Sequence, residues 1–475
     1  MISVQDGERA DALGDLAGFR GEFYRCLPRR ADALFELTDA VLCAEGPVST
    51  LVGLSLAGEH RRGHGALYDG LASGRVEIDR LRRSVAGLPL PRDRDGRIVL
   101  AVDVSPWLRP DAATCPDRSF CHVYGRGKGS AQMIPGWPYS FVAALETGRT
   151  SWTTILDAWR LGPCDDATAV TAAQVREIIE RLVAAGQYKP GDADILVVFD
   201  AGYDVTRLAF LLADLPVELL GRVRSDRIFR FPPPPRTAGT TGRRPKHGKE
   251  FRLADPTTQP GPDAATVTDT DRYGTARASA WNRLHPRLTH RAAWAVLAGP
   301  LPLIEGSLIR LTVDRLPGDR DPKPVWLWHS RPDVTASTVD RLWRAFLRRF
   351  DLEHTFRFLK QTLGWTRPRV RTLEQGERWT WLIVIAHTQL RLARHLTSDL
   401  RRPWEKPVTE PRRLTPARVR RGFRNLRPKT TLPASAPKPS RPGPGRPPGS
   451  KNKQRARRHD VGKNTASKHN TATTG

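Results

Sequence analysis

Residues 97–105 read RIVLAVDVS, a short apolar run rich in β-branched residues that contains the acid Asp103. Such a run is typical of a strand that is buried on both faces. Residues 193–204, ADILVVFDAGYD, repeat the pattern and reach the acid Asp200 where the apolar part ends. Either acid alone is also typical of a residue that caps a turn. Two such strands at one sheet edge would bring like charges together, which is costly unless a cation lies between them, so the pair predicts a cation site.

The segments around these two runs predict an α/β fold. Further strands are expected at 139–146 and 151–161, joined by a hairpin at 147–150. Helical spacing predicts a helix at 171–186, which ends at a glycine. The order is β-β-β-α-β-α-β, which indicates a mixed sheet with flanking helices. The remaining elements of this order are strands at 97–105, 193–204 and 217–225 and a short helix at 207–213.

Positive charge dominates the composition. The formal net charge is +27 and the sequence pI is about 10.8, which favours a polyanionic partner. DNA is favoured over a membrane, because no apolar run approaches the roughly 20 residues of a spanning helix. The N-terminus lacks the pattern of a secretory signal, so we expect a cytoplasmic location.

Much of this charge lies in residues 401–475, which contain 21 Lys or Arg against 3 Asp or Glu. Within this tail, RPGPGRPPGSKNKQRARR (441–458) resembles an AT-hook, in which Arg446 would enter the minor groove of A·T-rich DNA. The alternative is a solvated tail that touches phosphates without reading sequence. Both alternatives predict DNA as the partner.

Composition and periodicity divide the chain into five regions. A length of 475 residues exceeds one ordinary core, so more than one domain is expected. The expected regions are an N-terminal helical, DNA-binding domain at 1–95, the first part of the sheet core at 96–225, a β-rich insertion at 226–335, further core helices at 336–400 and a basic, largely disordered tail at 401–475.

Residues 348–361, RRFDLEHTFRFLKQ, place one carboxylate, Glu353, in a basic and aromatic helix. At 100° per residue, Phe346, Arg349, Glu353 and Lys360 share a face about 60° wide, with apolar residues on both flanks. A polar stripe flanked in this way should face a site rather than open water. Glu353 is therefore a candidate third ligand, and an all-oxygen ligand set suits Mg²⁺ or Mn²⁺.

These features resemble the DDE transposases of bacterial insertion sequences, whose catalytic core is ribonuclease H-like. Many members carry a Tyr-x2-Arg-x3-Glu-x6-Lys signature, which here reads Phe346-x2-Arg349-x3-Glu353-x6-Lys360. The stretches AVDVSPW, VVFDAGYD and GRRPKHG are similar to a subgroup of these proteins. The Tyr-to-Phe change removes a hydroxyl that could contact phosphate and leaves stacking of Phe346 on a base or sugar as its expected contact with DNA.

The resemblance implies the chemistry of the site. Asp103, Asp200 and Glu353 would hold two Mg²⁺ or Mn²⁺ ions, and Arg349 and Lys360 would hold DNA phosphates. The enzyme would cut double-stranded DNA at transposon ends and join the freed 3′-hydroxyls to target DNA. A homodimer in the synaptic complex also follows from the family alone.

Several residues offer alternatives. Asp204 could replace Asp200 as the ligand; Asp351 should point away from Glu353, and His354 is expected on the helix surface. Trp326 and Trp328 could stack on a flipped base or pack in the core of the insertion. Cys115, Cys121 and His122 could be imagined as zinc ligands, but the five cysteines lack a Cys-x-x-Cys pair and free thiols are expected.

Two other classes of function fit the sequence. A domesticated or inactive protein would bind transposon ends without cutting them. A ribonuclease H-like nuclease would cut without joining. Intact acids argue against the first, and the long insertion with its Arg-Glu-Lys stripe argues against the second.

Overall fold

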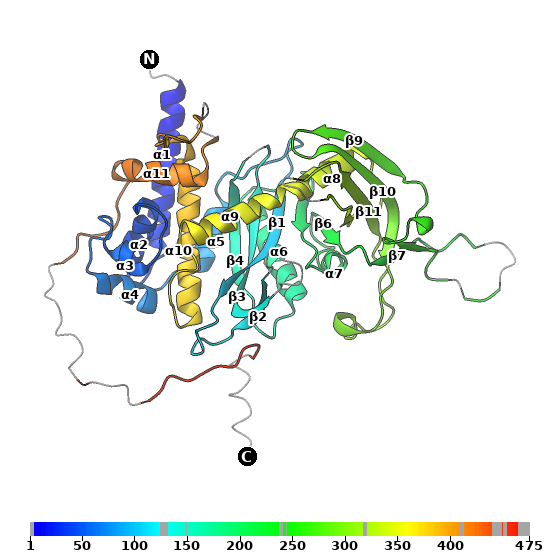
Figure 1. The fold of residues 1–475 in the computed structure, drawn as a ribbon, viewed down its shortest axis with the longest axis horizontal. Coiled ribbons are helices and arrows are strands. Elements are labelled where there is room, and N and C mark those ends of the chain that lie inside the picture. Colours follow the sequence, from blue (N-terminus) through cyan, green and yellow to red (C-terminus); the bar gives the residue numbers. More distant parts are fainter. Residues whose placement is uncertain are drawn as a thin grey trace.

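The computed structural model describes most of the chain (Figure 1). The ranges that it describes are 4–123, 132–148, 150–236, 241–243, 245–316, 321–408, 410, 413–438, 449 and 454–463.

A mixed sheet forms the centre of the molecule and confirms the predicted α/β class. Strand β1 is parallel to β5, which is parallel to β6, while β3 and β4 add antiparallel strands on the other side of β1. Together with α6 and α7 these strands follow the predicted order, and the arrangement is consistent with a ribonuclease H-like core. The bounds are β1 (Val99–Leu108), β3 (Gln132–Leu145), β4 (Thr153–Arg160), α6 (Ala167–Ala184), β5 (Ile195–Phe199), α7 (Val205–Leu211) and β6 (Val217–Val223).

The sequence did not predict β2 (Ser119–Val123) or the first half of β3, to which β2 pairs. Two prolines, Pro135 and Pro138, and Gly136 interrupt that half of β3 and hide the strand pattern. The glycine is required there, because a Cβ at position 136 would lie 2.6 Å from the carbonyl oxygen of Trp107.

The region 226–335 is β-rich as expected, and its strands continue the central sheet. Strand β12 pairs antiparallel with β6, and β11 and β10 follow in order. Trp326 and Trp328 are buried, and Trp326 packs on Trp281 with ring centroids 5.6 Å apart, so core packing is the correct alternative. The strands are β7 (Ile228–Arg230), β8 (Glu250–Arg252), β9 (Ala264–Thr270), β10 (Gly274–Pro286), β11 (Gly306–Val313) and β12 (Val325–His329).

The N-terminal region is helical as predicted, but its bundle includes helices from the other end of the chain (Figure 1). Helix α10 (Leu373–Leu392) packs on α1, α2 and α4 and also on β4, so it joins the bundle to the sheet. No helix within the described ranges is long and apolar enough to cross a membrane. The N-terminal helices are α1 (Val4–Arg25), α2 (Ala31–Cys43), α3 (Leu51–Ser55), α4 (His64–Ser73) and α5 (Ile78–Ala86).

The prediction of a largely disordered tail from residue 401 is wrong for its first part. Helix α11 (Pro416–Leu426) packs on α2 and α10 through Val419, Phe423 and Leu426, which are spaced four and three residues apart. The abundance of arginine around these residues concealed the apolar stripe. Farther along, residues 454–463 lie against the loop after β1, where His459 N donates to Ala113 O at 2.9 Å.

A buried ion-pair network ties these distant helices together. The Arg20 guanidinium in α1 donates to both oxygens of Asp39 in α2, at 2.7 and 2.9 Å, and to Gln389 in α10 at 2.6 Å. Arg427, just after α11, adds a contact to Asp39 at 3.2 Å. The Arg20–Asp39 pair therefore joins four segments of the chain.

We predict that Asp39→Ala lowers the free energy of unfolding by about 3–5 kcal/mol, because it leaves the fully buried Arg20 without its counter-ion. Urea unfolding followed by tryptophan fluorescence measures the effect. Asp79→Ala is the matched control: its carboxylate pairs with Arg82 but is 80% exposed, so a loss below about 1 kcal/mol is expected. Equal losses in the two variants would contradict the role of the network.

Candidate active site

The predicted catalytic helix is two helices that meet at Arg349. Helix α8 (Ala336–Arg348) ends and α9 (Phe350–Gln361) begins on either side of this residue. At the junction Arg349 N donates to Phe346 O at 3.2 Å and Leu352 N donates to Arg349 O at 3.0 Å, so each bond spans only three residues. This tighter local winding, which no Gly or Pro signals in the sequence, corrects the expectation of one uninterrupted helix.

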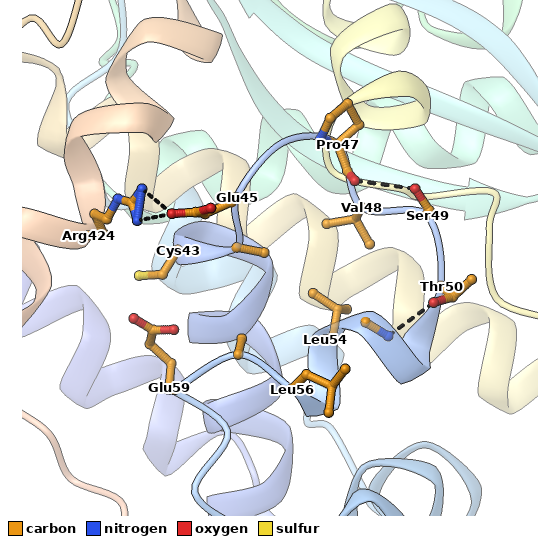
Figure 2. Close-up of a pocket in the computed structure, with 14 residues that line it drawn as sticks. Cys43, Glu45, Pro47, Val48, Ser49, Thr50, Leu54, Leu56, Glu59 and Arg424 are labelled. Carbon is orange, nitrogen blue, oxygen red and sulfur yellow. Dashed lines mark hydrogen bonds and ion pairs between the residues drawn. The ribbon is translucent and has the colours of Figure 1, made fainter.

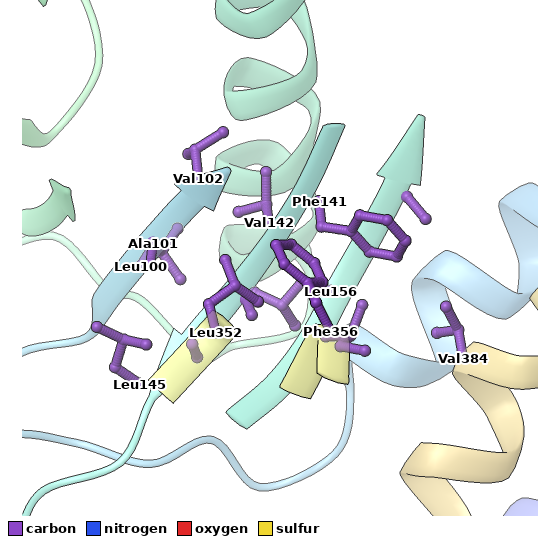
Figure 3. Close-up of a cluster of buried hydrophobic side chains, with 14 of the residues drawn as sticks. Leu100, Ala101, Val102, Phe141, Val142, Leu145, Leu156, Leu352, Phe356 and Val384 are labelled. Atoms are coloured by element: carbon purple, nitrogen blue, oxygen red, sulfur yellow. The ribbon is translucent and has the colours of Figure 1, made fainter. Parts of the chain in front are cut away.

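Apolar packing fixes α9 against the sheet. Leu352 and Phe356 extend from α9 into a buried cluster with Phe141 of β3 and residues of β1 (Figure 3). The rings of Phe141 and Phe356 lie edge to face with centroids 5.2 Å apart. This packing holds the first turn of α9, which carries Glu353, close to β1 and β3.

Strand register brings the two aspartates together. In the parallel pair of β1 and β5, Val102 is opposite Phe199, so Asp103 and Asp200 are the next residues of neighbouring strands. Asp103 Oδ1 accepts a hydrogen bond from Val104 N at 2.8 Å, which orients this carboxylate.

The guanidinium of Arg349 lies among all three acids. Its Nη1 is 3.0 Å from Asp103 Oδ2, and its Nη2 is 3.5 Å from both Asp200 Oδ2 and Glu353 Oε1. The Arg349 side chain is only 3% exposed, whereas that of Glu353 is 52% exposed. The structure therefore brings together the three acids that the sequence singled out, and it places the basic residue of the same stripe at their centre.

The cluster holds more acidic groups than basic ones. Burial raises the pKa of Asp103 to about 6; the charge of Arg349 opposes that rise, and the charges of Asp200 and Glu353 add to it. Asp200 Oδ1 is buried and has no hydrogen-bond partner among the described residues. One guanidinium therefore neither balances the charge of the three carboxylates nor supplies a hydrogen bond to each of their oxygens.

Tyr203 is a neighbour that the sequence analysis missed. Its ring packs on Phe199 with centroids 5.2 Å apart, and burial, with a contribution from the charge of Asp103, raises the pKa of its hydroxyl. The turn after β5 brings it back, since Tyr203 N donates to Asp200 O at 3.3 Å. Its position three residues after the acid was the available signal.

Carboxylate oxygens are the donors that Mg²⁺ and Mn²⁺ prefer, and the unpartnered oxygen of Asp200 fits a cation ligand. Across the described ranges no group of three or more His, Cys, Asp or Glu side chains is arranged to hold a metal ion. At the three acids, each carboxylate contacts Arg349 instead. The zinc alternative at Cys115 and Cys121 gains no support, and all five cysteines are free.

Lys360 and Phe346 are more buried than the sequence predicted. Lys360 is largely buried, with Nζ 5.6 Å from the centroid of Trp365, and burial lowers its pKa to about 8. Phe346 is 3% exposed and packs beneath Arg349, so its ring is not open for the stacking on DNA that we expected. The aromatic residue that is exposed beside Arg349 is Phe350, 41% exposed with its centroid 5.1 Å from the guanidinium carbon. Arg446 lies outside the described residues.

The alternative site residues have other roles. Asp204 is the N-cap of α7: its Oδ1 accepts from Arg207 N at 3.1 Å and from Thr206 Oγ1 at 2.8 Å. His354 is exposed, as expected of a helix-surface residue. Burial raises the pKa of Asp351 to about 7, opposed by Arg348 and assisted by Glu146, so its neighbours are not the three acids.

A pocket of about 510 Å³ lies away from the acids, between α3 and α11 (Figure 2). Arg424 and Glu45 pair across it at 2.7 and 2.8 Å. It contains none of the candidate site residues, and we assign it no part in the chemistry.

Comparison with known proteins supplies an independent finding. A family model described as DDE superfamily endonuclease matches residues 22–287, more than half of the 475 residues. The matched range contains Asp103 and Asp200 and ends before Glu353. No curated protein matches the chain.

The burial of Lys360 predicts a pH-dependent cost to stability. The pKa of Lys360 is about 8 in the folded protein, whereas its ordinary value is 10.5. Between pH 8 and pH 10.5 the unfolded chain therefore binds more protons than the folded protein, so the free energy of unfolding rises with pH over this range. At pH 7 Lys360→Met, which keeps the chain length without the charge, should raise the free energy of unfolding by up to about 3 kcal/mol and remove that rise.

Urea unfolding at pH 7 and at pH values between 8 and 10.5 tests this expectation. Arg357→Met is the matched control, because Arg357 is exposed on the same helix and should change stability little at either pH. Destabilisation by Lys360→Met at pH 7 would show that the ammonium stabilises the fold.

Proposed function

The chain belongs to the DDE superfamily endonucleases, and from that membership we propose that it is a transposase of a bacterial insertion sequence. It binds the terminal inverted repeats, cuts DNA at the transposon ends and joins the 3′-hydroxyls to target DNA. The observation that carries this proposal is the convergence of Asp103, Asp200 and Glu353 on one cation at the sheet edge. The spacing from Arg349 to Glu353 to Lys360 supports transposition over simple cleavage.

Asp103, Asp200 and Glu353 would hold two Mg²⁺ or Mn²⁺ ions. When bound, such ions activate the attacking oxygen and stabilise the leaving oxygen in an in-line displacement at phosphorus. Asp103 and Asp200 are fixed by neighbouring strands and form the rigid side of the site. Glu353 is half exposed on a helix and would be the acid most accessible to arriving DNA.

Lys360 would bind a DNA phosphate beside the acids. Its ammonium is already largely desolvated, so a phosphate that approaches it meets a charge little screened by water. The net charge of +27 supports broad contact with the DNA backbone. A homodimer in the synaptic complex and a place in the bacterial cytoplasm are parts of the same proposal.

We predict that Asp103→Asn, Asp200→Asn and Glu353→Gln each lower Mg²⁺-dependent cleavage of an end-containing duplex by about 1,000-fold or more. Each change removes a negative charge that would hold the ions but keeps the shape of the side chain. Binding of the same duplex, measured by fluorescence anisotropy in EDTA, should change only a few-fold.

Asp204→Asn is the matched control, since Asn retains the N-cap and the residue lies only four positions after Asp200. It should cleave like the unaltered protein. Full cleavage by any of the three acid variants would remove that residue from the site. A pre-cut end should be joined to target plasmid; cleavage without joining would identify a nuclease, and tight end binding without cleavage would identify a DNA-binding relic.

A further inference from the structure

Arg349 makes more contacts with acids than an ordinary structural ion pair. Its guanidinium reaches three carboxylates from three elements, within 3.5 Å of each. The side chain is buried, and its Nε has no partner among the described residues. Buried arginines that serve the fold reach fewer carboxylates: Arg20 contacts Asp39, and Arg82 contacts Asp79 and Asp157.

We infer that Arg349 is an internal cation that holds the three carboxylates together in the metal-free protein and leaves them for a DNA phosphate when metal ions bind. This inference rests on the proposed function. It makes Arg349 a positioning residue that couples DNA binding to metal loading.

Charge balance supports the exchange. Three carboxylates and one guanidinium leave a cluster with two negative charges. Two divalent ions added beside a stationary Arg349 would reverse this to two positive charges, and like charges this close together repel strongly where water screens them little. Departure of Arg349 toward an arriving phosphate relieves this repulsion and neutralises one phosphate charge.

The surroundings of Arg349 allow such a movement. The guanidinium carbon is close to two rings, 5.8 Å from the centroid of the buried Phe346 and 5.1 Å from that of the exposed Phe350. The face of Phe350 offers a cation–π contact nearer to solvent, on the same side as the half-exposed Glu353. The side chain can therefore move outward from acids to aromatic surface without losing all of its contacts.

Thermodynamic linkage makes the inference measurable. If DNA removes a competitor of the metal, DNA raises metal affinity, and metal raises DNA affinity by the same factor. In the unaltered protein we expect a short duplex from the flank of the gene to raise Mn²⁺ affinity by about 10-fold or more. Electron paramagnetic resonance of free Mn²⁺ reports the binding directly, with 3′-dideoxy ends to prevent joining.

Arg349→Gln is the decisive variant. Without the competing charge, the free protein should bind Mn²⁺ about 10-fold more tightly than the unaltered protein, and the duplex should add little. Arg357→Gln, on the exposed side of α9, should behave like the unaltered protein. Weaker Mn²⁺ binding by free Arg349→Gln, or an undiminished effect of DNA, would overturn the inference.

Arg349→Lys keeps the test decisive if Arg349→Gln does not fold. Lysine retains the competing charge, so the free variant should bind Mn²⁺ within about threefold of the unaltered protein; a tenfold gain would contradict the inference. Absence of any DNA effect in the unaltered protein would overturn it without a variant. Asp103→Asn separates the two proposals. If this variant binds Mn²⁺ as the unaltered protein does, the metal site itself is refuted. If it loses Mn²⁺ binding but DNA still raises the Mn²⁺ affinity of Arg349→Gln as much as in the unaltered protein, only the role of Arg349 is refuted.

Discussion

Three carboxylates that meet at one partly buried sheet edge repel one another unless positive charge lies among them or one of them takes up a proton. In this chain Asp103, Asp200 and Glu353 meet that constraint through a single guanidinium, that of Arg349. The compensation is incomplete, because one oxygen of Asp200 is buried without a partner and burial still raises the pKa of Asp103. An arrangement that the protein alone does not satisfy is typical of a site built for added ligands.

The rest of the fold brings these three acids to one place. Parallel pairing of β1 and β5 places two acids side by side, and apolar packing of α9 on the sheet adds the third. Helix α10 then ties the sheet to the helical bundle, whose own buried pair of Arg20 and Asp39 holds segments from both ends of the chain.

Much of this arrangement could be predicted from the sequence, and the failures have physical causes. Asp103 and Asp200 were found because buried strands read as apolar runs whose ends are visible, and Glu353 because helical spacing is regular. The contact of Arg349 with all three acids was missed, since a shared helix face predicts that Arg349 lies near the site but not which groups it contacts. Phe346 was placed on the polar stripe, yet in three dimensions that position packs beneath the arginine. Helix α11 was not predicted, because the arginine-rich composition of this segment indicated disorder and its apolar stripe was overlooked.

The central claim is that the acids around Arg349 form a metal site that DNA opens. Anomalous scattering from crystals grown with Mn²⁺ and a duplex from the flank of the gene tests it most directly. The account predicts manganese peaks bound by Asp103 and Asp200, with Glu353 as a further ligand and the Arg349 guanidinium withdrawn from the carboxylates onto phosphate. Manganese bound elsewhere, or an Arg349 that still contacts all three acids in a DNA complex with ions present, would contradict it.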